Sequence, residues 1–266
     1  MYKHWYITVK PTLDLINARH IVEVGALFGA NTCNLLEWCK CNDAHLTSID
    51  CFPSQELLAI RDRNCGDIFT LLENTSLDAL PQLCDYDAIL LDGDHNWYTV
   101  YHELESIERY CKPFPLVYFH DVAWPYARRD MYYSPSSIPA EFRNEYAKQG
   151  MVKGKSDLVK SGGVGGDNFN AIHEGGAHNG VLTGIEDFIK NTSSSFRLAV
   201  SNFEHGLGLL AHFELLERYP PLVDFFDYID SAKSPDNLLS EALLNSTSWK
   251  ITKPIRYLGR ILKRGK

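Results

Sequence analysis

The stretch IVEVGALFGANT, residues 21–32, decides the fold of this 266-residue chain. Its apolar, β-branched first half suits a strand buried on both faces of a parallel sheet. Gly25 and Gly29 then stand where the strand turns into a helix, and a glycine there lets the backbone pass close to a ligand. The stretch therefore predicts a strand, a glycine turn and a helix, which is how a ligand-binding α/β sheet begins.

Strand and helix patterns alternate through the rest of the first half of the chain. Strands are predicted at 20–24, 45–50, 67–72, 87–92 and 116–121. Helices are predicted at 32–39, 54–64 and 97–110, and later at 184–190 and about 213–244. This alternation predicts a mostly parallel, Rossmann-like sheet with helices on both faces. The apolar runs 197–203 and 208–213 predict an antiparallel hairpin at the sheet edge.

Charge and composition narrow the function. A formal net charge of −8 argues against general nucleic-acid binding, because phosphates would be repelled. The seven cysteines form no CxxC pair, which predicts reduced thiols in a cytoplasmic protein. The sequence shows no signal-peptide core and no run near the roughly 20 apolar residues of a membrane span. We therefore expect a cytoplasmic protein.

The glycine turn and the end of the next strand predict a cofactor site. The spacing Glu23-x-Gly25-x-x-x-Gly29 does not fit the dinucleotide fingerprint GxGxxG. Asp50 ends the next strand at the distance where a ribose-binding carboxylate sits in such folds. The alternative is structural: the glycines form only a tight turn, and Asp50 caps the following helix.

These segments resemble the class I S-adenosylmethionine-dependent methyltransferases. EVGALFGANT, residues 23–32, looks like the first motif of that family, and SID, residues 48–50, looks like the second. The resemblance covers roughly residues 21–213, including the hairpin. It implies that S-adenosylmethionine is the cofactor, with the glycine loop against its methionine part and the acid at its ribose. By position, the implied cofactor residues are Glu23, Gly25, Ala26, Gly29, Thr32, Asp50 and Asp92.

A second cluster of functional residues follows two neighbouring strands. Asp92-Gly93-Asp94-His95 ends one predicted strand, and His120-Asp121 ends the next. Because adjacent parallel strands lie about 4.8 Å apart, the two ends can share one site. Two carboxylates with imidazole and water fit a divalent cation such as Mg²⁺ or Mn²⁺, and His95 suits a general base. In the structural alternative, Asp92 and Asp94 cap the following helix and His120 is a core histidine.

This cluster resembles a narrower group. DGDHNWY, residues 92–98, followed by a strand ending in HD, looks like the family that includes macrolide-sugar O-methyltransferases. The resemblance implies that Asp92 and Asp121 bind the metal, with His120 as a third ligand, and that His95 is the catalytic base. Those relatives tend to carry a second acid where this chain has His120.

Residues 122–180 are expected to form a substrate-binding insert. Aromatic faces stack on sugar rings, and arginine donates to hydroxyls or phosphate. The candidate acceptor residues are Trp124, Tyr126, Arg128, Arg129, Tyr132 and Tyr133. The alternative is a packed structural insert. The glycine-rich stretch 161–180 is expected to be a lid or a disordered segment, with His173 and His178 in reach of the substrate.

The C-terminal segment is distinct from the predicted methyltransferase domain at 1–246. Residues 247–266 combine an apolar stripe with basic residues, which is typical of a helix lying on an anionic membrane surface. The alternatives are a solvated helix or a partner-docking segment. SWKITKPIR, residues 248–256, is similar to endings of bacterial polysaccharide-assembly proteins, which implies a glycosyltransferase partner and a place at the inner face of the membrane.

Together these patterns predict an O-methyltransferase that acts on a sugar hydroxyl of a glycan, glycolipid or glycosylated metabolite, in polysaccharide biosynthesis. Two other functions compete with it. A metal-dependent, iron-using hydroxylase on the same fold would share the acid and histidine cluster. A non-catalytic module could instead scaffold a glycan-assembly complex through the tail.

Overall fold

The computed structural model describes residues 1–64, 66 and 68–231. Its centre is a seven-stranded sheet with the order β3-β2-β1-β4-β5-β10-β9. The first five strands are parallel, whereas β10 runs antiparallel to both β5 and β9. The strands are β1 (His20–Val24), β2 (His45–Ile49), β3 (Phe69–Leu72), β4 (Ala88–Leu91), β5 (Leu116–His120), β9 (Phe196–Ser201) and β10 (Leu207–His212).

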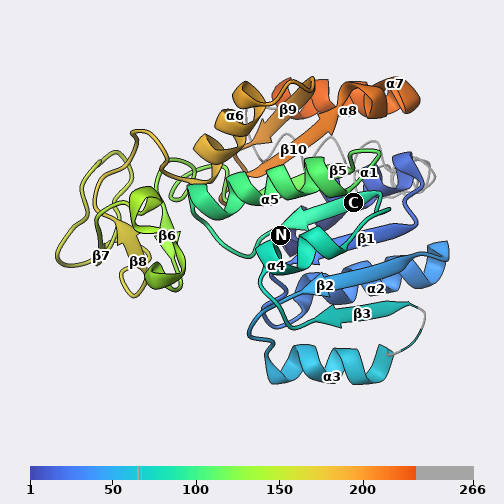
Figure 1. Ribbon diagram of the computed structural model, residues 1–266, viewed down its shortest axis with the longest axis horizontal. Coiled ribbons are helices and arrows are strands. Elements are labelled where there is room, and N and C mark those ends of the chain that lie inside the picture. The colour runs from blue at the N-terminus through green and yellow to red at the C-terminus, as the bar shows by residue number, and fades with distance from the viewer. Residues whose placement is uncertain (65, 67, 232–266) are drawn as a thin grey trace, which may run out of the picture.

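Helices cover both faces of the sheet (Figure 1). One apolar core joins the sheet to α1 (Lys10–Ile16), α2 (Ala30–Asn42) and α8 (Pro220–Ser231). The other core joins it to α5 (Trp97–Tyr110) and α6 (Val181–Asn191). The remaining helices are α3 (Gln55–Asn64), α4 (Ser76–Ala79) and α7 (Phe213–Arg218), with short helical turns at Tyr2–His4, Trp5–Val9, Leu80–Gln82, Pro135–Ser137 and Ala140–Phe142. The Rossmann-like sheet and its terminal hairpin are thus confirmed.

The insert between β5 and α6 forms a lobe beside the carboxyl ends of the strands (Figure 1). It holds a small antiparallel sheet of order β6-β8-β7, made by β6 (Met131–Tyr132), β7 (Tyr146–Lys148) and β8 (Phe169–Ala171). The sequence had shown no periodicity here, because strands of two or three residues are too short to carry one. The glycine-rich stretch 161–180 contains β8 and is part of this lobe, so its function as a lid stays a prediction.

Asp130 fastens the insert to the main domain. One carboxylate oxygen of this buried residue accepts hydrogen bonds from the backbone N–H groups of Trp97 and Gly180, both at 2.7 Å. The other oxygen accepts from the Tyr132 hydroxyl at 2.7 Å and from Asn144 Nδ2 at 2.9 Å. Because Trp97 begins α5, this carboxylate ties the insert directly to the segment that carries the acid and histidine cluster.

The predicted domain boundary at 246 and the tail 247–266 lie outside the described residues. None of the helices in the described part of the chain has both the length and the apolar character needed to span a bilayer. The six cysteines in that part are all free thiols.

Candidate active site

The turn between β1 and α2 is braced from behind by a buried carboxylate. Glu23 accepts hydrogen bonds from Asn31 Nδ2 at 2.9 Å, Thr32 Oγ1 at 2.6 Å and Ser48 Oγ at 2.8 Å. Burial raises the pKa of Glu23, and the three donors oppose that shift. The structure therefore places Glu23 and Thr32 inside the protein, where they shape the turn, rather than on the surface that would meet a cofactor.

Gly25 brings this turn against the end of β4. Its backbone φ is +80°, and a Cβ atom there would lie 2.4 Å from the carbonyl oxygen of Asp92. Only glycine combines that conformation with that contact. The glycine turn and the first residue of the acid and histidine cluster are therefore in direct backbone contact.

Asp50 holds the outer side of the same turn. Its Oδ2 accepts from the backbone N–H groups of Ala26 at 3.0 Å and Leu27 at 3.2 Å, and its Oδ1 accepts from Phe52 N at 3.0 Å. It does not cap the next helix, because Ser54 Oγ accepts from Leu57 N there. A carboxylate offers about four acceptor sites, so half-buried Asp50 can still accept from a hydroxyl.

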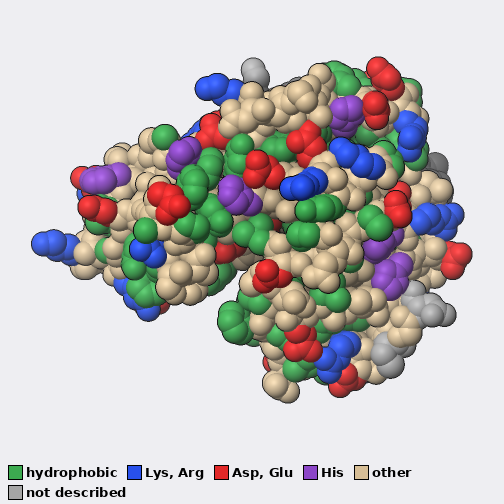
Figure 2. Space-filling view, in the orientation of Figure 1, with side chains coloured by type: hydrophobic (Ala, Val, Ile, Leu, Met, Phe, Trp, Pro, Cys, Tyr) green, Lys and Arg blue, Asp and Glu red, His purple; other side chains and the backbone are tan. Residues whose placement is uncertain are grey.

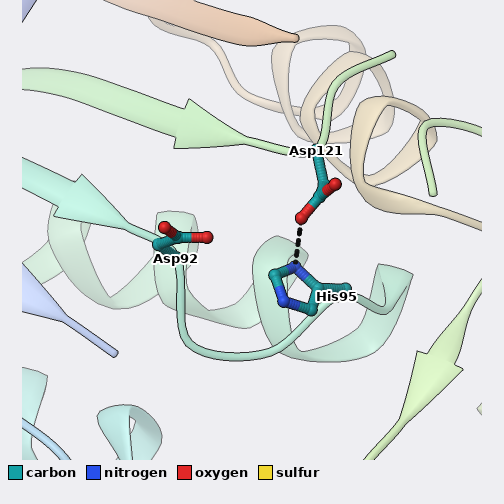
Figure 3. Close-up of side chains that lie close together, drawn as sticks. All are labelled: Asp92, His95 and Asp121. Atoms are coloured by element: carbon teal, nitrogen blue, oxygen red, sulfur yellow. Dashed lines mark ion pairs between the residues drawn. The ribbon is translucent and has the colours of Figure 1, made fainter. Parts of the chain in front are cut away.

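The predicted cluster meets at the carboxyl ends of β4 and β5 (Figure 3). Asp92, His95 and Asp121 can each place one ligand atom within 4.8 Å of the others. His95 Nδ1 lies 3.1 Å from Asp121 Oδ2. His120 joins them, because its Nδ1 lies 3.0 Å from Asp92 Oδ1 and 3.1 Å from Asp121 Oδ2.

A bend after β5 explains how two consecutive side chains reach one site. Successive residues of a strand point to opposite faces. Asp121, however, has a left-handed φ of +60°, which breaks that alternation directly after His120. His120 and Asp121 can therefore contact each other and the Asp92 and His95 side chains.

Close contact between these groups sets their charges. Burial lowers the pKa of His120, but its hydrogen bonds with Asp121 and Asp92 outweigh burial and raise it to about 9. Burial raises the pKa of Asp92, but the hydrogen bond and the charge of His120 lower it to about 2. The pKa of Asp121 is lowered as well, against burial, by the same histidine and by His95. At neutral pH both carboxylates are ionised and His120 carries a positive charge.

The cap of α5 is Asn96, not Asp92 or Asp94. Asn96 has an extended backbone and its Oδ1 accepts from Thr99 N at 2.9 Å. Asp94 accepts instead from the Thr99 hydroxyl at 3.1 Å. The structural alternative for Asp92 is therefore wrong, and its carboxylate faces the cluster.

The first residues of the chain also reach the cluster, a contact that no sequence motif predicts. The α-ammonium group of Met1 lies 2.8 Å from Asp92 Oδ2. One turn later, His4 is 98% buried, with its ring 5.9 Å from the His120 ring and 5.5 Å from the Phe203 ring. The Lys3 ammonium binds Glu204 at 2.7 Å and holds this turn against the β9–β10 hairpin. These contacts join residues about 90 to 200 positions apart, and no local pattern encodes them.

Two of the predicted acceptor residues surround His95. The Tyr126 ring stacks on it, with centroids 5.7 Å apart and an interplanar angle of 16°. The exposed Tyr133 ring lies 5.9 Å away. The Tyr126 hydroxyl accepts from Asn168 Nδ2 at 3.2 Å. Trp124, also predicted, is half-buried at the start of the insert.

Other predicted acceptor residues lie elsewhere. The guanidinium of Arg129 is 1% exposed and donates to the backbone carbonyls of Ser156, Ala171 and Ile172. Tyr132 is also buried, at 1% exposure, on Asp130. Neither side chain has surface for an acceptor, so both belong to the interior of the insert. Three further residues have other partners: Arg128 binds Glu186 of α6, His173 binds Asp157 within the lobe, and His178 lies against the Trp97 ring of α5.

Comparisons with known proteins agree with this fold. Residues 22–122 match the family model described as a methyltransferase domain. That range runs from β1, through the glycine turn and Asp50, to the cluster at the ends of β4 and β5. No curated protein matches the sequence.

Several solved structures are similar to this chain at low identity. A methyltransferase from Podospora anserina bound to S-adenosylhomocysteine is 12% identical, with a TM-score of 0.49 over 78% of this chain and 76% of that one. The O-methyltransferase TomG of Streptomyces achromogenes, in complex with S-adenosylmethionine, is 13% identical, with a TM-score of 0.45 over 79% and 78%. An O-methyltransferase from Bacillus cereus, in complex with S-adenosylhomocysteine, is 13% identical, with a TM-score of 0.45 over 79% and 80%. Residues 22–122, which carry the glycine turn, Asp50 and the cluster, are therefore similar to the methyltransferase domain family.

Proposed function

We propose that the chain is an S-adenosylmethionine-dependent O-methyltransferase that acts on a sugar hydroxyl, with His95 as general base beside a divalent metal. The observation that carries this proposal is the position of the His95–Asp121 pair. Asp121 follows β5, and His95 follows the neighbouring strand β4, whose end touches the glycine turn. A base and a methyl-donor site are therefore adjacent, as transfer to a hydroxyl requires.

The cofactor would lie across the carboxyl ends of β1, β2 and β4. S-adenosylmethionine supplies an electrophilic methyl group on its sulfonium. We assign the backbone of Gly25, Ala26 and Gly29 to its methionine part, because the turn lets a ligand approach the main chain. Asp50 would accept from the ribose hydroxyls with its free acceptor capacity.

His95 is oriented for proton abstraction. Its Nδ1 contacts Asp121 Oδ2, which stabilises a proton on that nitrogen and leaves Nε2 as the acceptor. His95 is 8% exposed, and its ring stacks on the Tyr126 ring. The imidazole therefore has little freedom to rotate. Removing the hydroxyl proton as the methyl group arrives makes the oxygen a better nucleophile.

The residues present fit a divalent cation. Asp92 and Asp121 supply carboxylate oxygens and His120 an imidazole nitrogen. A metal bound there would orient the acceptor hydroxyl and lower its pKa. Asp92 is not needed as a helix cap, since Asn96 caps α5.

A sugar acceptor is supported by the aromatic residues around the base. Tyr126 and Tyr133 place ring faces beside His95, and such faces stack on sugar rings. For the segment 247–266 we propose contact with an anionic membrane or with a glycosyltransferase, on its sequence alone.

Calorimetric titration with S-adenosylmethionine tests the cofactor half of the proposal. Asp50→Ala should weaken binding at least tenfold, since a hydrogen bond to a charged acceptor contributes about 1.5–3 kcal/mol. Equal affinity for the two proteins would remove Asp50 from the cofactor site.

Transfer of a labelled methyl group to sugar acceptors tests the reaction, whereas a hydroxylase would leave that methyl group on the cofactor.

A further inference from the structure

The insert carries a cavity that the proposed active site does not use, called here the β7 cavity. Its volume is about 410 Å³, within the range of roughly 300–1,000 Å³ of small-molecule sites. Its lining comes from the helical turn 140–142, the segment that leads into β7 and the residue after β8: Ala140, Arg143, Asn144, Glu145, Tyr146 and Ile172. None of them belongs to the acid and histidine cluster or to the predicted acceptor residues.

The groups that line the β7 cavity suit a neutral sugar. The Tyr146 ring, 38% exposed, offers an apolar face. Arg143 supplies guanidinium N–H donors and Glu145 supplies carboxylate acceptors, which match the hydroxyls of a sugar. A phosphate attracted by Arg143 would be repelled by Glu145. Only Ala140 and Ile172 are aliphatic, so the cavity has too little apolar surface for a lipid chain.

Hydrogen bonds hold two of the lining side chains in place. Asn144 Nδ2 donates to Asp130 Oδ2 and to the His178 carbonyl, both at 2.9 Å, which leaves Asn144 Oδ1 as an acceptor for a ligand. Arg143 Nη1 donates to a backbone carbonyl at 2.7 Å, and its Cζ lies 6.0 Å from the centroid of the Tyr146 ring. Such a lining is ordered before a ligand arrives, which lowers the entropy cost of binding.

The backbone of β6 separates the β7 cavity from the base. At the end of β6, the Tyr133 ring lies 5.9 Å from the His95 ring. The ring of the preceding residue, Tyr132, instead lies edge-on to Tyr146, with centroids 5.8 Å apart. Successive residues of an extended chain point to opposite sides, and β7 is the strand of the small sheet farthest from β6. A sugar in the β7 cavity therefore cannot be the sugar that meets the base.

We propose that the β7 cavity binds a second, neutral sugar unit of an oligosaccharide or polysaccharide acceptor, remote from the unit that is methylated. The inference rests on the proposed function and adds to it the size of the acceptor. Holding one unit of a polymer raises the effective concentration of its other units at the base, without any new contact there.

Binding of the full-length protein to an array of bacterial surface glycans, from single sugars to long oligosaccharides, tests the β7 cavity without methyl transfer. The wild type should bind the long glycans at least about tenfold more tightly than single sugars, because they can engage two sites. Tyr146→Ala should lower the affinity for long glycans at least about tenfold, as the loss of a tyrosine anchor does. Glu145→Ala should weaken it as well, and because Glu145 is exposed this variant keeps the fold.

Tyr110→Ala is the matched control. The Tyr110 residue is 39% exposed and its ring also lies beside an arginine, with Arg109 Cζ 5.3 Å from the ring centroid, but it ends α5 rather than lining the cavity. This variant should bind glycans like the wild type. No binding of any glycan by the wild type, Tyr146 and Glu145 variants that behave like the control, or displacement of the glycan by inorganic phosphate would each overturn the inference.

Methyl-transfer kinetics separates this inference from the proposed function. Tyr146→Ala should raise the ratio of KM for a long glycan to KM for a single sugar about tenfold. Transfer with the same KM ratio in wild type and variant would refute only the role of the β7 cavity. Glycan binding that depends on Tyr146, without methyl transfer to any glycan, would refute the proposed function and leave the sugar site.

Discussion

Replacing Gly25 by alanine should force the glycine turn away from the end of β4, which carries Asp92. The new Cβ would lie 2.4 Å from the Asp92 carbonyl oxygen and 2.5 Å from Gly93 Cα, both backbone atoms of β4's end that cannot rotate away. The turn and the strand end must therefore move apart. We expect loss of stability and of cofactor binding together.

The size of the effect follows from two terms. A left-handed backbone costs a residue with a Cβ about 1–2 kcal/mol. Moving the turn also strains two backbone hydrogen bonds, Gly25 N to Ile49 O and Asp92 N to Val24 O, both 2.9 Å. Each contributes about 0.5–1.5 kcal/mol net. The sum is about 2–5 kcal/mol of unfolding free energy.

Gly154→Ala isolates the conformational term. Gly154 has a similar φ, +86°, but a Cβ there would meet no atom within 4 Å. Denaturant unfolding of both variants should show a loss of about 1–2 kcal/mol for Gly154→Ala and a larger one for Gly25→Ala. Equal losses, with S-adenosylmethionine binding intact in both, would refute the argument that the turn and the β4 end are in obligatory contact.

Three further predictions concern the base, a buried acid and the tail. His95→Ala should lower turnover by about 10²–10⁴-fold with cofactor affinity nearly unchanged, and calorimetry with single-turnover kinetics checks the separation. Burial raises the pKa of Glu103 to about 8, so this carboxyl stays protonated in the folded protein while the unfolded chain ionises from about pH 4.5. Stability should therefore fall between about pH 4.5 and 8, by at most about 1.4 kcal/mol per pH unit from this group, and Glu103→Gln should flatten the urea-unfolding profile over that window. Deleting 249–266 should release the protein from anionic vesicles in a sedimentation assay, since each basic residue near the surface contributes about 1 kcal/mol; full-length protein that ignores such vesicles at low salt would exclude the membrane contact.

The sequence predicted those parts of the protein that depend on short-range patterns. The buried strands β1, β4 and β5 are continuous apolar runs, and the polar residues that follow β4 and β5 must meet because parallel neighbours end at one edge. Asp92, His95, His120 and Asp121 were therefore found together from their order alone.

The rest depended on contacts that only the folded chain shows. Met1 and His4 reach the cluster across 91 and more residues, and their own neighbours carry no motif. Arg129 and Tyr132 look like ligand-binding residues in sequence, but in the fold Arg129 donates to backbone carbonyls of the insert and Tyr132 donates to Asp130. Residue type alone cannot distinguish an arginine that binds a sugar from one that donates hydrogen bonds to the backbone of a loop.

Asp130 has a consequence for how acceptor preference can diverge. Its hydrogen bond from Trp97 N anchors the insert at the start of α5, and its bonds from Gly180, Tyr132 and Asn144 hold together the segments of the insert and its junction with α6. The loops at 134–142 and 153–168 are coupled to the same region, because Phe142 stacks on Trp97 and Asn168 donates to the Tyr126 hydroxyl. The insert is thus one packed unit that contacts the main domain at Trp97, at His95 and at Glu186. Designers who graft a different acceptor lobe onto this sheet should transplant residues 130–180 as a unit, and should keep Asp130 with its partner at the first residue of α5.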